Sequence, residues 1–346
     1  MAKHIDTTMT GWTTKGLGDL ERGRVEIPEP SGGELVVRVS ACGVCRTDLH
    51  VIDGELPPRR TPVVPGHQVV GEVQWTGPGA TRFVTGDRVG IAWLAGTCGS
   101  CVWCLSGREN LCPSARFTGW DRDGGYAEYV LVDERFAYSF PDDLDPIETA
   151  PLLCAGIIGF RALSRARVPA GGTLGIYGFG SSGSLVAKMA AASGVTVHVM
   201  TRGERNRELA RSLGLGSVGE EADAPPEPLD SAIVFAPAGA LVPVALEATT
   251  AGGTVVVAGI HLSDVPAMTY ADHLFRERDL RSVTANTRAD GEAFLRLARK
   301  LRLRASVTRY GPADTAQALD DLRAGRAAGS LVIAGGGSGI RSPQTG

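Results

Sequence analysis

The chain has 346 residues, 43% of them hydrophobic and 21% charged, a composition typical of a globular protein with room for two domains. Its formal net charge is −3 and it has no basic block, which argues against a nucleic-acid or anionic-membrane partner. No apolar run reaches the ~18 residues of a membrane span. The opening MAKHIDTTMT lacks the basic and apolar regions of a secretory signal. We therefore expect a cytoplasmic protein without a membrane partner.

The first part of the chain is rich in short apolar segments that are interrupted by Gly and Pro. This pattern predicts an irregular antiparallel sheet. The expected strands are 34–39, 68–77, 86–93 and 125–132. A cysteine-rich loop is inserted between the third and the fourth of them.

That loop, CGSCVWCLSGRENLC, holds four of the seven cysteines: Cys98, Cys101, Cys104 and Cys112. The C-x2-C-x2-C-x7-C spacing is compact enough to surround one tetrahedral ion. Disulfides are the alternative, but they need an oxidising compartment, which the missing secretory signal argues against. Four thiolates fill every position of a tetrahedral zinc. We therefore predict a structural zinc site and expect the chemistry to lie elsewhere.

Beyond about residue 156, apolar strands alternate with helical segments. The expected strands are 173–178, 195–200, 231–236 and 253–259, and the helical segments include 184–194 and 204–214. This alternation predicts an α/β unit with a doubly wound parallel sheet. A helix at 291–301 and further short strands follow, which the pattern alone does not assign to either domain.

The first strand of this second unit runs directly into GFGSSG, in which Gly178, Gly180 and Gly183 enclose Ser181 and Ser182. A lone G-x-G-x-x-G is weak evidence, and a glycine-rich turn without a ligand is the alternative. Here a strand precedes the motif and a helix follows it, which is the arrangement that holds a pyrophosphate at a helix N-terminus. We predict a dinucleotide site.

The type of dinucleotide is set about 20 residues later, where NAD-binding proteins usually carry an acidic residue against the ribose. This chain has VHVMTRGE, with Thr201 at that position, Arg202 next to it, and Glu204 too late to substitute. Arg202 is either a cation for a 2′-phosphate or a solvated surface residue. We predict a preference for NADP(H) over NAD(H).

Three further candidate ligands, Cys45, His67 and Cys154, are widely separated in the chain. A Cys2His set with an open fourth position would be a catalytic zinc site, although the spacing does not prove it. A lone cysteine in an apolar run is often packed core, and a lone histidine is often structural. A redox C-x-x-C formed by Cys42 and Cys45 would need a thioredoxin-like unit, which the pattern does not contain.

Taken together, GVCRTDLH, PGHQVVGEV, the cysteine loop, DGGYAEYV, LLCAG and GFGSSG occur in an order that resembles the zinc-dependent alcohol dehydrogenases of the medium-chain dehydrogenase/reductase superfamily. The resemblance covers essentially the whole chain. It implies that Cys45, His67 and Cys154 bind a catalytic zinc and that the four-cysteine lobe binds a structural zinc.

The resemblance also implies an architecture. A GroES-like, mostly-β catalytic domain would comprise 1–155 and 288–346, with the zinc lobe at 95–113. A Rossmann dinucleotide-binding domain at 156–287 would be inserted into it. Substrate would lie in the cleft between the two domains.

By the same resemblance, Thr47 would take the alcohol proton, His50 would be the outer histidine of the proton relay, and Arg46 would face the cofactor pyrophosphate. Asp48 would orient the zinc-binding histidine, a role that zinc sites commonly need. Trp93 would line the substrate pocket, with a core aromatic as its alternative.

One residue departs from the family pattern. Gln68 follows the histidine of PGH, where many members carry Glu. The amide removes a negative charge from behind the metal but leaves its direct ligands in place. We expect activity to survive, while transient carboxylate coordination during ligand exchange is put in doubt.

These features predict an enzyme that transfers hydride between a primary alcohol or aldehyde and NADP(H). A polyol or secondary-alcohol dehydrogenase is the near alternative. A non-enzymatic zinc- and nucleotide-binding redox sensor is the alternative from another class, against which the open Cys2His set argues. The resemblance implies a small-molecule substrate and a homodimer or homotetramer.

Overall fold

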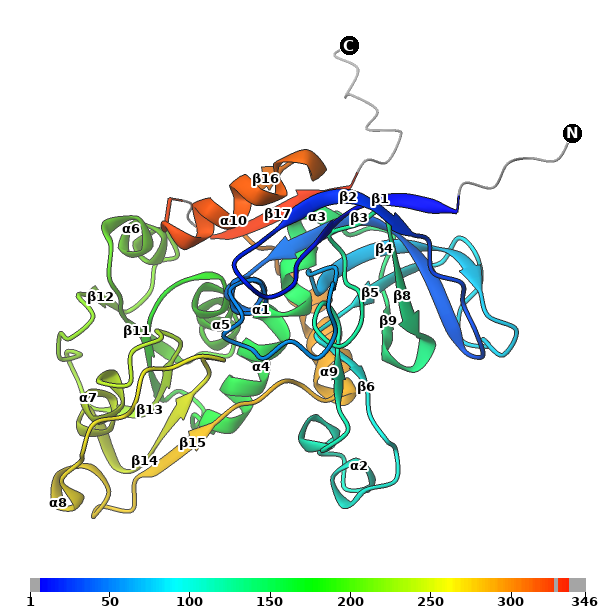
Figure 1. Ribbon diagram of the computed structural model, residues 1–346. Helices are drawn as coiled ribbons and strands as arrows, with labels where there is room; N and C mark the ends of the chain where they lie inside the picture. Colours follow the sequence, from blue (N-terminus) through cyan, green and yellow to red (C-terminus); the bar gives the residue numbers. More distant parts are fainter. Residues whose placement is uncertain (1–6, 327–328, 336–346) are drawn as a thin grey trace, which may run out of the picture.

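The computed structural model describes residues 7–326 and 329–335. Part of the opening stretch MAKHIDTTMT and the end of the catalytic range predicted to run to residue 346 therefore lie outside the described residues. The described chain has two large sheets, one at each side of the molecule in Figure 1, with helices between and around them, and two small two-stranded sheets.

The first sheet has six parallel strands in the order β12-β11-β10-β13-β14-β15. Its strands are β10 (Thr173–Tyr177), β11 (Thr196–Met200), β12 (Ser217–Gly219), β13 (Leu229–Val234), β14 (Thr249–Val257) and β15 (Asp279–Ser282). The strand order reverses between β10 and β13, which is where doubly wound sheets bind their ligands. The Rossmann fold is thereby confirmed.

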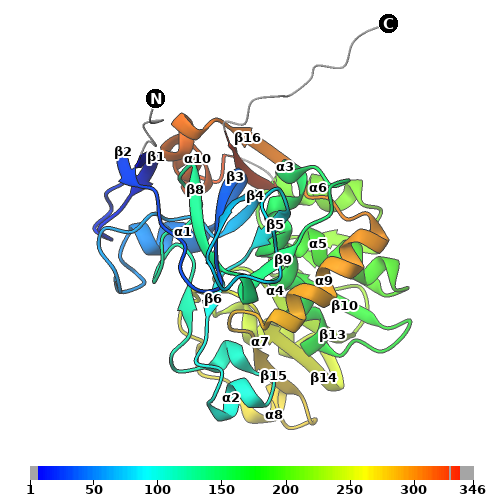
Figure 2. The same cartoon turned by 90° about the vertical axis from the view of Figure 1, so that its right-hand side faces the viewer.

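Helices cover both faces of this sheet. They are α4 (Ala155–Ala166), α5 (Ser181–Ala192), α6 (Glu204–Ser212), α7 (Leu241–Glu247), α8 (Tyr270–His273) and α9 (Arg288–Leu301). The helices α4, α5 and α9 lie side by side in Figure 2. Close packing of α9 on α4 depends on Gly156, because a Cβ there would lie 2.3 Å from Cζ of the buried Phe294.

The second sheet has seven strands, all antiparallel except for one pair. They are β3 (Glu34–Val44), β4 (Gln68–Thr76), β5 (Arg88–Ile91), β8 (Tyr129–Asp133), β9 (Ala137–Ser139), β16 (Val307–Tyr310) and β17 (Ser330–Ala334). The last strand, β17, pairs with β3, with Leu331 opposite Val44. In Figure 1 the red end of the chain accordingly lies beside the blue beginning.

Shorter elements complete this mostly-β part. They are the hairpin β1 (Thr8–Thr13) and β2 (Glu21–Glu26), the pair β6 (Leu94–Gly96) and β7 (Arg116–Phe117), the helices α1 (Arg46–Ile52), α2 (Val102–Leu105), α3 (Pro146–Thr149) and α10 (Thr315–Arg323), and the 3-10 helices η1 (Glu109–Leu111), η2 (Glu134–Phe136), η3 (Ala150–Leu153) and η4 (Pro312–Asp314). The cysteine lobe between β6 and β7 therefore contains short helices, although it was expected to be a plain loop.

The strand expected at 125–132 begins only at Tyr129. Its first residues bond to the segment before β4 instead: Gly125 N–H donates to the carbonyl of Gly66 over 2.8 Å, and Tyr126 N–H to that of Pro65 over 3.0 Å. This detour brings Tyr126 beside the segment that carries His67.

No single helix in the described residues is both long and apolar enough to cross a membrane. Two consecutive segments, Pro146–Leu153 and Ala155–Ala166, are long and apolar enough only when they are taken together, and they are bent by 44° relative to each other. Residues of both segments, among them Leu152 and Ile157, belong to the buried core.

Candidate active site

The first candidate ligand, Cys45, lies directly before helix α1. The helix begins with Arg46 because the chain turns after strand β3 and Asp48 caps its first turn. The carboxylate of Asp48 accepts the backbone N–H of Cys45 over 2.8 Å. This bond fixes the backbone that carries the Cys45 thiol.

The same carboxylate holds His67. Its Oδ1 lies 3.0 Å from His67 Nδ1, while the hydroxyl of Tyr126 donates to Oδ2 over 2.9 Å. His67 and Asp48 are almost fully buried. The bond to Nδ1 leaves Nε2 free to face the Cys45 sulfur, 3.5 Å away. Asp48 therefore contacts Cys45, His67 and Tyr126, of which Tyr126 was not predicted.

Cys154 completes the set from the start of helix α4. The Cys45 and Cys154 sulfurs and a His67 ring nitrogen all lie within 4.8 Å of one another. Two thiols and one imidazole on a shared centre form the donor set of a catalytic zinc site, with a fourth position left for substrate. The structure therefore brings together three ligands that are far apart in sequence.

The surroundings of these donors shift their pKa values. The hydrogen bond with Cys154, together with burial, raises the pKa of Cys45. Burial acts to lower the pKa of His67, but the negative charges of Cys45 and Asp48 outweigh it and raise that pKa to about 10. Metal binding would therefore release protons from the ligands.

Aromatic rings form one wall of the cleft next to this group. Trp93 packs edge-on against His67 at 4.9 Å between centroids. It stacks on Phe117 at 5.0 Å and on Trp120 at 6.0 Å. Trp93 is buried, as a core aromatic would be, and it also lines the cleft. Gln68, 2% exposed, also lines the cleft beside His67.

The cleft has a volume of about 780 Å³ and runs from these ligands to the GFGSSG loop. Each of the three glycines of the loop is required for a different structural reason. Gly178 has φ +92°, and a Cβ there would lie 2.6 Å from the nitrogen of Ala236. At Gly183 a Cβ would lie 2.6 Å from the Gly178 carbonyl oxygen, whereas at Gly180 it would meet nothing within 4 Å. The open side of Gly180 lets a pyrophosphate approach the start of α5, so the loop fits a dinucleotide.

Ser181 and Ser182 line the cleft at the start of α5. The hydroxyl of Ser181 lies 2.5 Å from that of Ser330, which belongs to the other sheet. Arg46, exposed at the start of α1, lines the same cleft. Thr47, mostly buried, lines it one residue further on.

The far end of the cleft contains the residues predicted to choose the cofactor. Thr201 is buried, and its hydroxyl accepts the Phe179 N–H over 3.1 Å. The side chain of Arg202 is 71% exposed and forms an ion pair with Glu221 over 3.2 Å. Arg205 lines the same end of the cleft. Arg202 therefore lines the cleft, but its guanidinium is already paired with the carboxylate of Glu221.

His50 lies one turn after Thr47 on helix α1, with its side chain 14% exposed. Its Nδ1 is hydrogen-bonded to the carboxylate of Glu55. Residues three apart share one helix face, so Thr47 and His50 lie along one side of α1.

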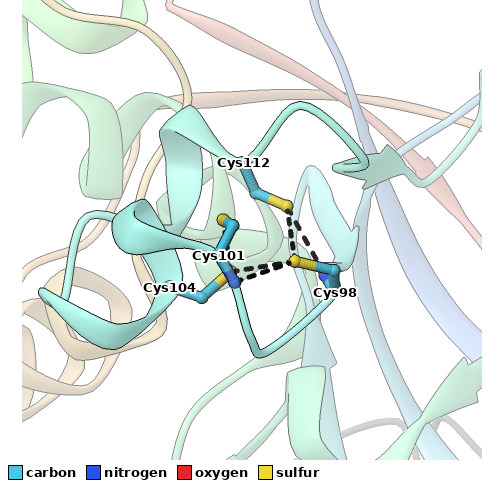
Figure 3. Close-up of side chains that lie close together, drawn as sticks. All are labelled: Cys98, Cys101, Cys104 and Cys112. Carbon is cyan, nitrogen blue, oxygen red and sulfur yellow. Dashed lines mark hydrogen bonds between the residues drawn. The ribbon is translucent and has the colours of Figure 1, made fainter.

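The four cysteines of the lobe converge as well (Figure 3). The sulfur of Cys98 lies 3.5 Å from that of Cys112 and 3.9 Å from that of Cys104, and the Cys101 and Cys104 sulfurs are 3.5 Å apart. Four sulfurs on one zinc at ~2.3 Å lie about 3.8 Å apart, so the lobe fits a tetrahedral zinc. Backbone N–H groups of Ser100 and Cys101 lower the pKa of Cys98 to about 6, which favours its thiolate. All seven cysteines are free thiols.

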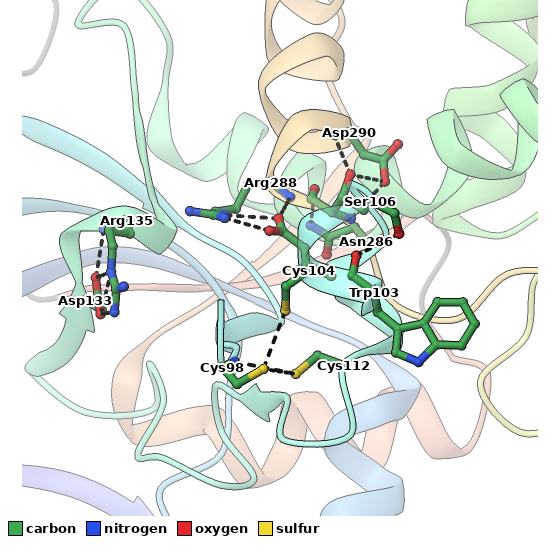
Figure 4. A network of polar contacts seen from close by, with 12 residues as sticks. Cys98, Trp103, Cys104, Ser106, Cys112, Asp133, Arg135, Asn286, Arg288 and Asp290 are labelled. Atoms are coloured by element: carbon green, nitrogen blue, oxygen red, sulfur yellow. Dashed lines mark hydrogen bonds and ion pairs between the residues drawn. The ribbon is translucent and has the colours of Figure 1, made fainter. Parts of the chain in front are cut away.

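The lobe is tied to the segment that leads into helix α9. Glu109 accepts the backbone N–H of Arg288 over 2.8 Å and pairs with its guanidinium over 2.6 Å. Asn110 donates to the carbonyl of Thr284 over 2.8 Å. Figure 4 places Arg288 and Asn286 next to the cysteines of the lobe. The lobe therefore braces the junction between the two sheets.

Several residues of the site, in the cleft wall or behind its ligands, were missed in the sequence. Tyr126 was visible in DGGYAEYV but had no assigned role. Phe117, Trp120 and Glu221 had no local signal, because only the folded chain brings their segments to the cleft.

The chain matches two family models, "Alcohol dehydrogenase GroES-like domain" over residues 31–142 and "Zinc-binding dehydrogenase" over residues 183–300. It is 52% identical to "Probable alcohol dehydrogenase AdhA" from Mycobacterium tuberculosis (strain CDC 1551 / Oshkosh) over 94% of this chain and 97% of that protein.

Two solved structures are also similar. A putative zinc-binding dehydrogenase from Sinorhizobium meliloti 1021 bound to NADP has a TM-score of 0.83 and 30% identity, over 95% of this chain and 100% of that one. Acetophenone reductase from Geotrichum candidum in complex with NAD has a TM-score of 0.86 and 26% identity, over 95% of this chain and 98% of that one.

The chain belongs to the zinc-dependent alcohol dehydrogenases of the medium-chain dehydrogenase/reductase superfamily. It is an oxidoreductase of a family that works with zinc and a nicotinamide cofactor. Its donor set and glycine loop fit both groups.

Proposed function

We propose that this enzyme interconverts apolar primary alcohols and their aldehydes with NADP(H), at a zinc ion held by Cys45, His67 and Cys154. The convergence of these three donors at the inner end of the cleft carries the proposal. When bound, the zinc supplies a Lewis acid for the substrate oxygen, and the nicotinamide accepts or supplies the hydride.

Thr47 and His50 provide the proton path. Thr47 lines the cleft, and its hydroxyl is the group proposed to accept the alcohol proton. His50 gives its Nδ1–H to Glu55, which leaves Nε2 to receive the proton on its way to solvent. In aldehyde reduction the same groups deliver the proton in the opposite direction.

The aromatic wall supports an apolar substrate. Trp93, Phe117 and Trp120 line the cleft, and Leu56, which packs against the same apolar cluster, lines it as well. A polyol would leave its extra hydroxyl groups without partners on these rings, at a cost in binding free energy. A secondary alcohol is the second candidate, because a structure with 26% identity is named acetophenone reductase.

The cofactor preference rests on Arg202. Its guanidinium can form charge-assisted hydrogen bonds with a 2′-phosphate, and no carboxylate stands at Thr201 to repel one. Glu221, however, already pairs with Arg202. We therefore propose a preference of about tenfold, the lower end of what a charged hydrogen bond of ~1.5–3 kcal/mol gives. The Glu221→Gln variant should strengthen it.

The four-cysteine lobe is proposed to hold the structural zinc. We also propose a homo-oligomer, because β15 is one of the two edge strands of the six-stranded sheet and exposed apolar residues lie near it. These include Tyr270, Phe275 and Leu280, which are 66, 65 and 39% exposed. Sedimentation velocity of the wild type beside Phe275→Glu tests this, since the charge should favour the monomer.

A kinetic panel is the decisive experiment. Linear, branched, aromatic and polyol substrates are measured with NADP(H) and NAD(H), in both directions. The proposal expects the highest kcat/KM for apolar primary substrates with NADP(H). Higher kcat/KM for secondary alcohols would favour the second candidate, and no turnover of any alcohol or aldehyde by protein with two zincs would contradict both.

A further inference from the structure

A second group of metal-ligating side chains lies at the mouth of the cleft, outside both cysteine sites. It consists of His50 in α1, Glu55 just after that helix, and His261 in the segment after β14. One ligand atom from each residue lies within 4.8 Å of the other two. The first two residues come from the mostly-β part, and His261 comes from the dinucleotide-binding part.

The geometry points to a third metal site: we propose that His50, Glu55 and His261 bind a divalent transition-metal ion such as Zn²⁺ in exchange with solution. Two imidazole nitrogens and one carboxylate oxygen form a donor set that zinc takes in open sites. Magnesium and calcium prefer oxygen ligands alone, so neither should compete.

The present contacts already hold the donors close together. The His50 and His261 rings stack at 5.0 Å between centroids with planes 28° apart. Glu55 hydrogen-bonds to His50, and its Oε2 lies 4.0 Å from Nδ1 of His261. The bond to His50 lowers the pKa of Glu55, so its carboxylate is ionised at neutral pH. Small side-chain rotations would turn all three donors to one ion.

The exposure of the group predicts reversible binding. The side chains of Glu55 and His261 are 46 and 58% exposed, whereas that of His50 is 14% exposed. Water can therefore fill the remaining positions and exchange with other ligands. Because the ligands come from two parts of the chain, binding also depends on those two parts keeping the spacing seen here.

Occupation of this site would affect catalysis through His50. Ile260, beside His261, and Leu56, beside Glu55, line the cleft, so an ion there sits at its mouth. The His50 nitrogen that faces Glu55 is Nδ1. An ion on Nδ1 leaves the ring hydrogen on Nε2, so Nε2 can no longer accept the proton of the alcohol. We therefore infer that excess Zn²⁺ inhibits the enzyme reversibly. This inhibition rests on the proton path of the proposed function, whereas the binding of the ion does not.

The binding test uses the complete enzyme, loaded to two zincs per chain and desalted. Zn²⁺ is titrated into it by calorimetry, with Mg²⁺ as a parallel titrant. We expect one additional Zn²⁺ per chain with micromolar affinity and no binding of Mg²⁺. His261→Gln should weaken the additional binding by at least about tenfold, because loss of even an outer hydrogen-bond partner of a ligand costs that much.

Asp264→Asn is the matched control. It removes a carboxylate from the same exposed segment, outside the group, and should leave the additional binding unchanged. The site is refuted if wild type binds no additional Zn²⁺ at millimolar concentration, or if His261→Gln binds it as tightly as wild type.

The inhibition test measures alcohol oxidation with added Zn²⁺, each variant being normalised to its own rate without added metal. Wild type and Asp264→Asn should lose activity and regain it with citrate, while His261→Gln should resist. Additional binding without inhibition would uphold the site and contradict the proton path through His50.

Discussion

Removal of the Tyr126 hydroxyl tests how firmly His67 is held. The hydroxyl donates to Asp48 over 2.9 Å, and Asp48 in turn bonds to His67 and to the Cys45 N–H. Burial, followed by the negative charge of Asp48, raises the pKa of Tyr126, so the phenol stays protonated and remains a donor. Tyr126→Phe deletes this one bond and keeps the ring.

The structure gives the expected size of the effect. Tyr126 and Asp48 are 3 and 2% exposed, so no water can replace the hydroxyl. A buried hydrogen bond to a charged group contributes ~1.5–3 kcal/mol, and we expect the free energy of unfolding to fall by that amount. Loss of such outer contacts typically costs about 10- to 100-fold in metal affinity or activity.

Two assays separate these effects. Denaturant unfolding of the zinc-loaded protein gives the stability change, and competition with a chelator gives the affinity for the cleft zinc. Tyr129→Phe is the control, because it removes a hydroxyl three residues away whose ring packs on Trp75 at 5.2 Å, away from the cleft. If Tyr126→Phe matches Tyr129→Phe in both assays, Asp48 does not need Tyr126 to orient His67.

Three further predictions concern the zinc sites, the cofactor and the proton path. Cys101→Ser should lower thermal stability while the folded fraction keeps its turnover. Cys45→Ser should abolish turnover with a smaller loss of stability. If folded Cys101→Ser retains its other zinc but has no activity, the assignment of the structural and catalytic zinc sites is wrong. Arg202→Ala should raise KM for NADPH about tenfold and change KM for NADH little, in steady-state kinetics; equal changes would place Arg202 outside the cofactor site. Thr47→Ala should reduce kcat for alcohol oxidation more than His50→Gln, whose loss should be greatest at low pH; equal and pH-independent losses would contradict the proton path.

Much of the fold could be predicted because local patterns determine it. The alternation of strands and helices after residue 156 indicated the parallel sheet, and the glycines of GFGSSG indicated its ligand-binding turn. The spacing of Cys98, Cys101, Cys104 and Cys112 indicated one metal, because ligands so close in sequence converge whatever surrounds them. In each case a short stretch contains its own physical reason.

The cleft could not be derived in this way. Spacing alone left Cys45, His67 and Cys154 as three separate candidates, and they were grouped only through the family resemblance. Tertiary structure decided their convergence, because the end of β3, the segment before β4 and the start of α4 meet only when both sheets are packed.

The same reason applies to the residues that the sequence did not indicate. Tyr126 reaches Asp48 because residues 124–126 bond to residues 64–66 instead of extending strand β8. His261 meets His50 across 211 positions. The sequence by itself determined which chemical groups are present and which turns they follow. Only the packing of distant segments decided which of those groups share a hydrogen bond, a charge or a metal ion, because such contacts depend on distance in space and leave no periodic trace along the chain.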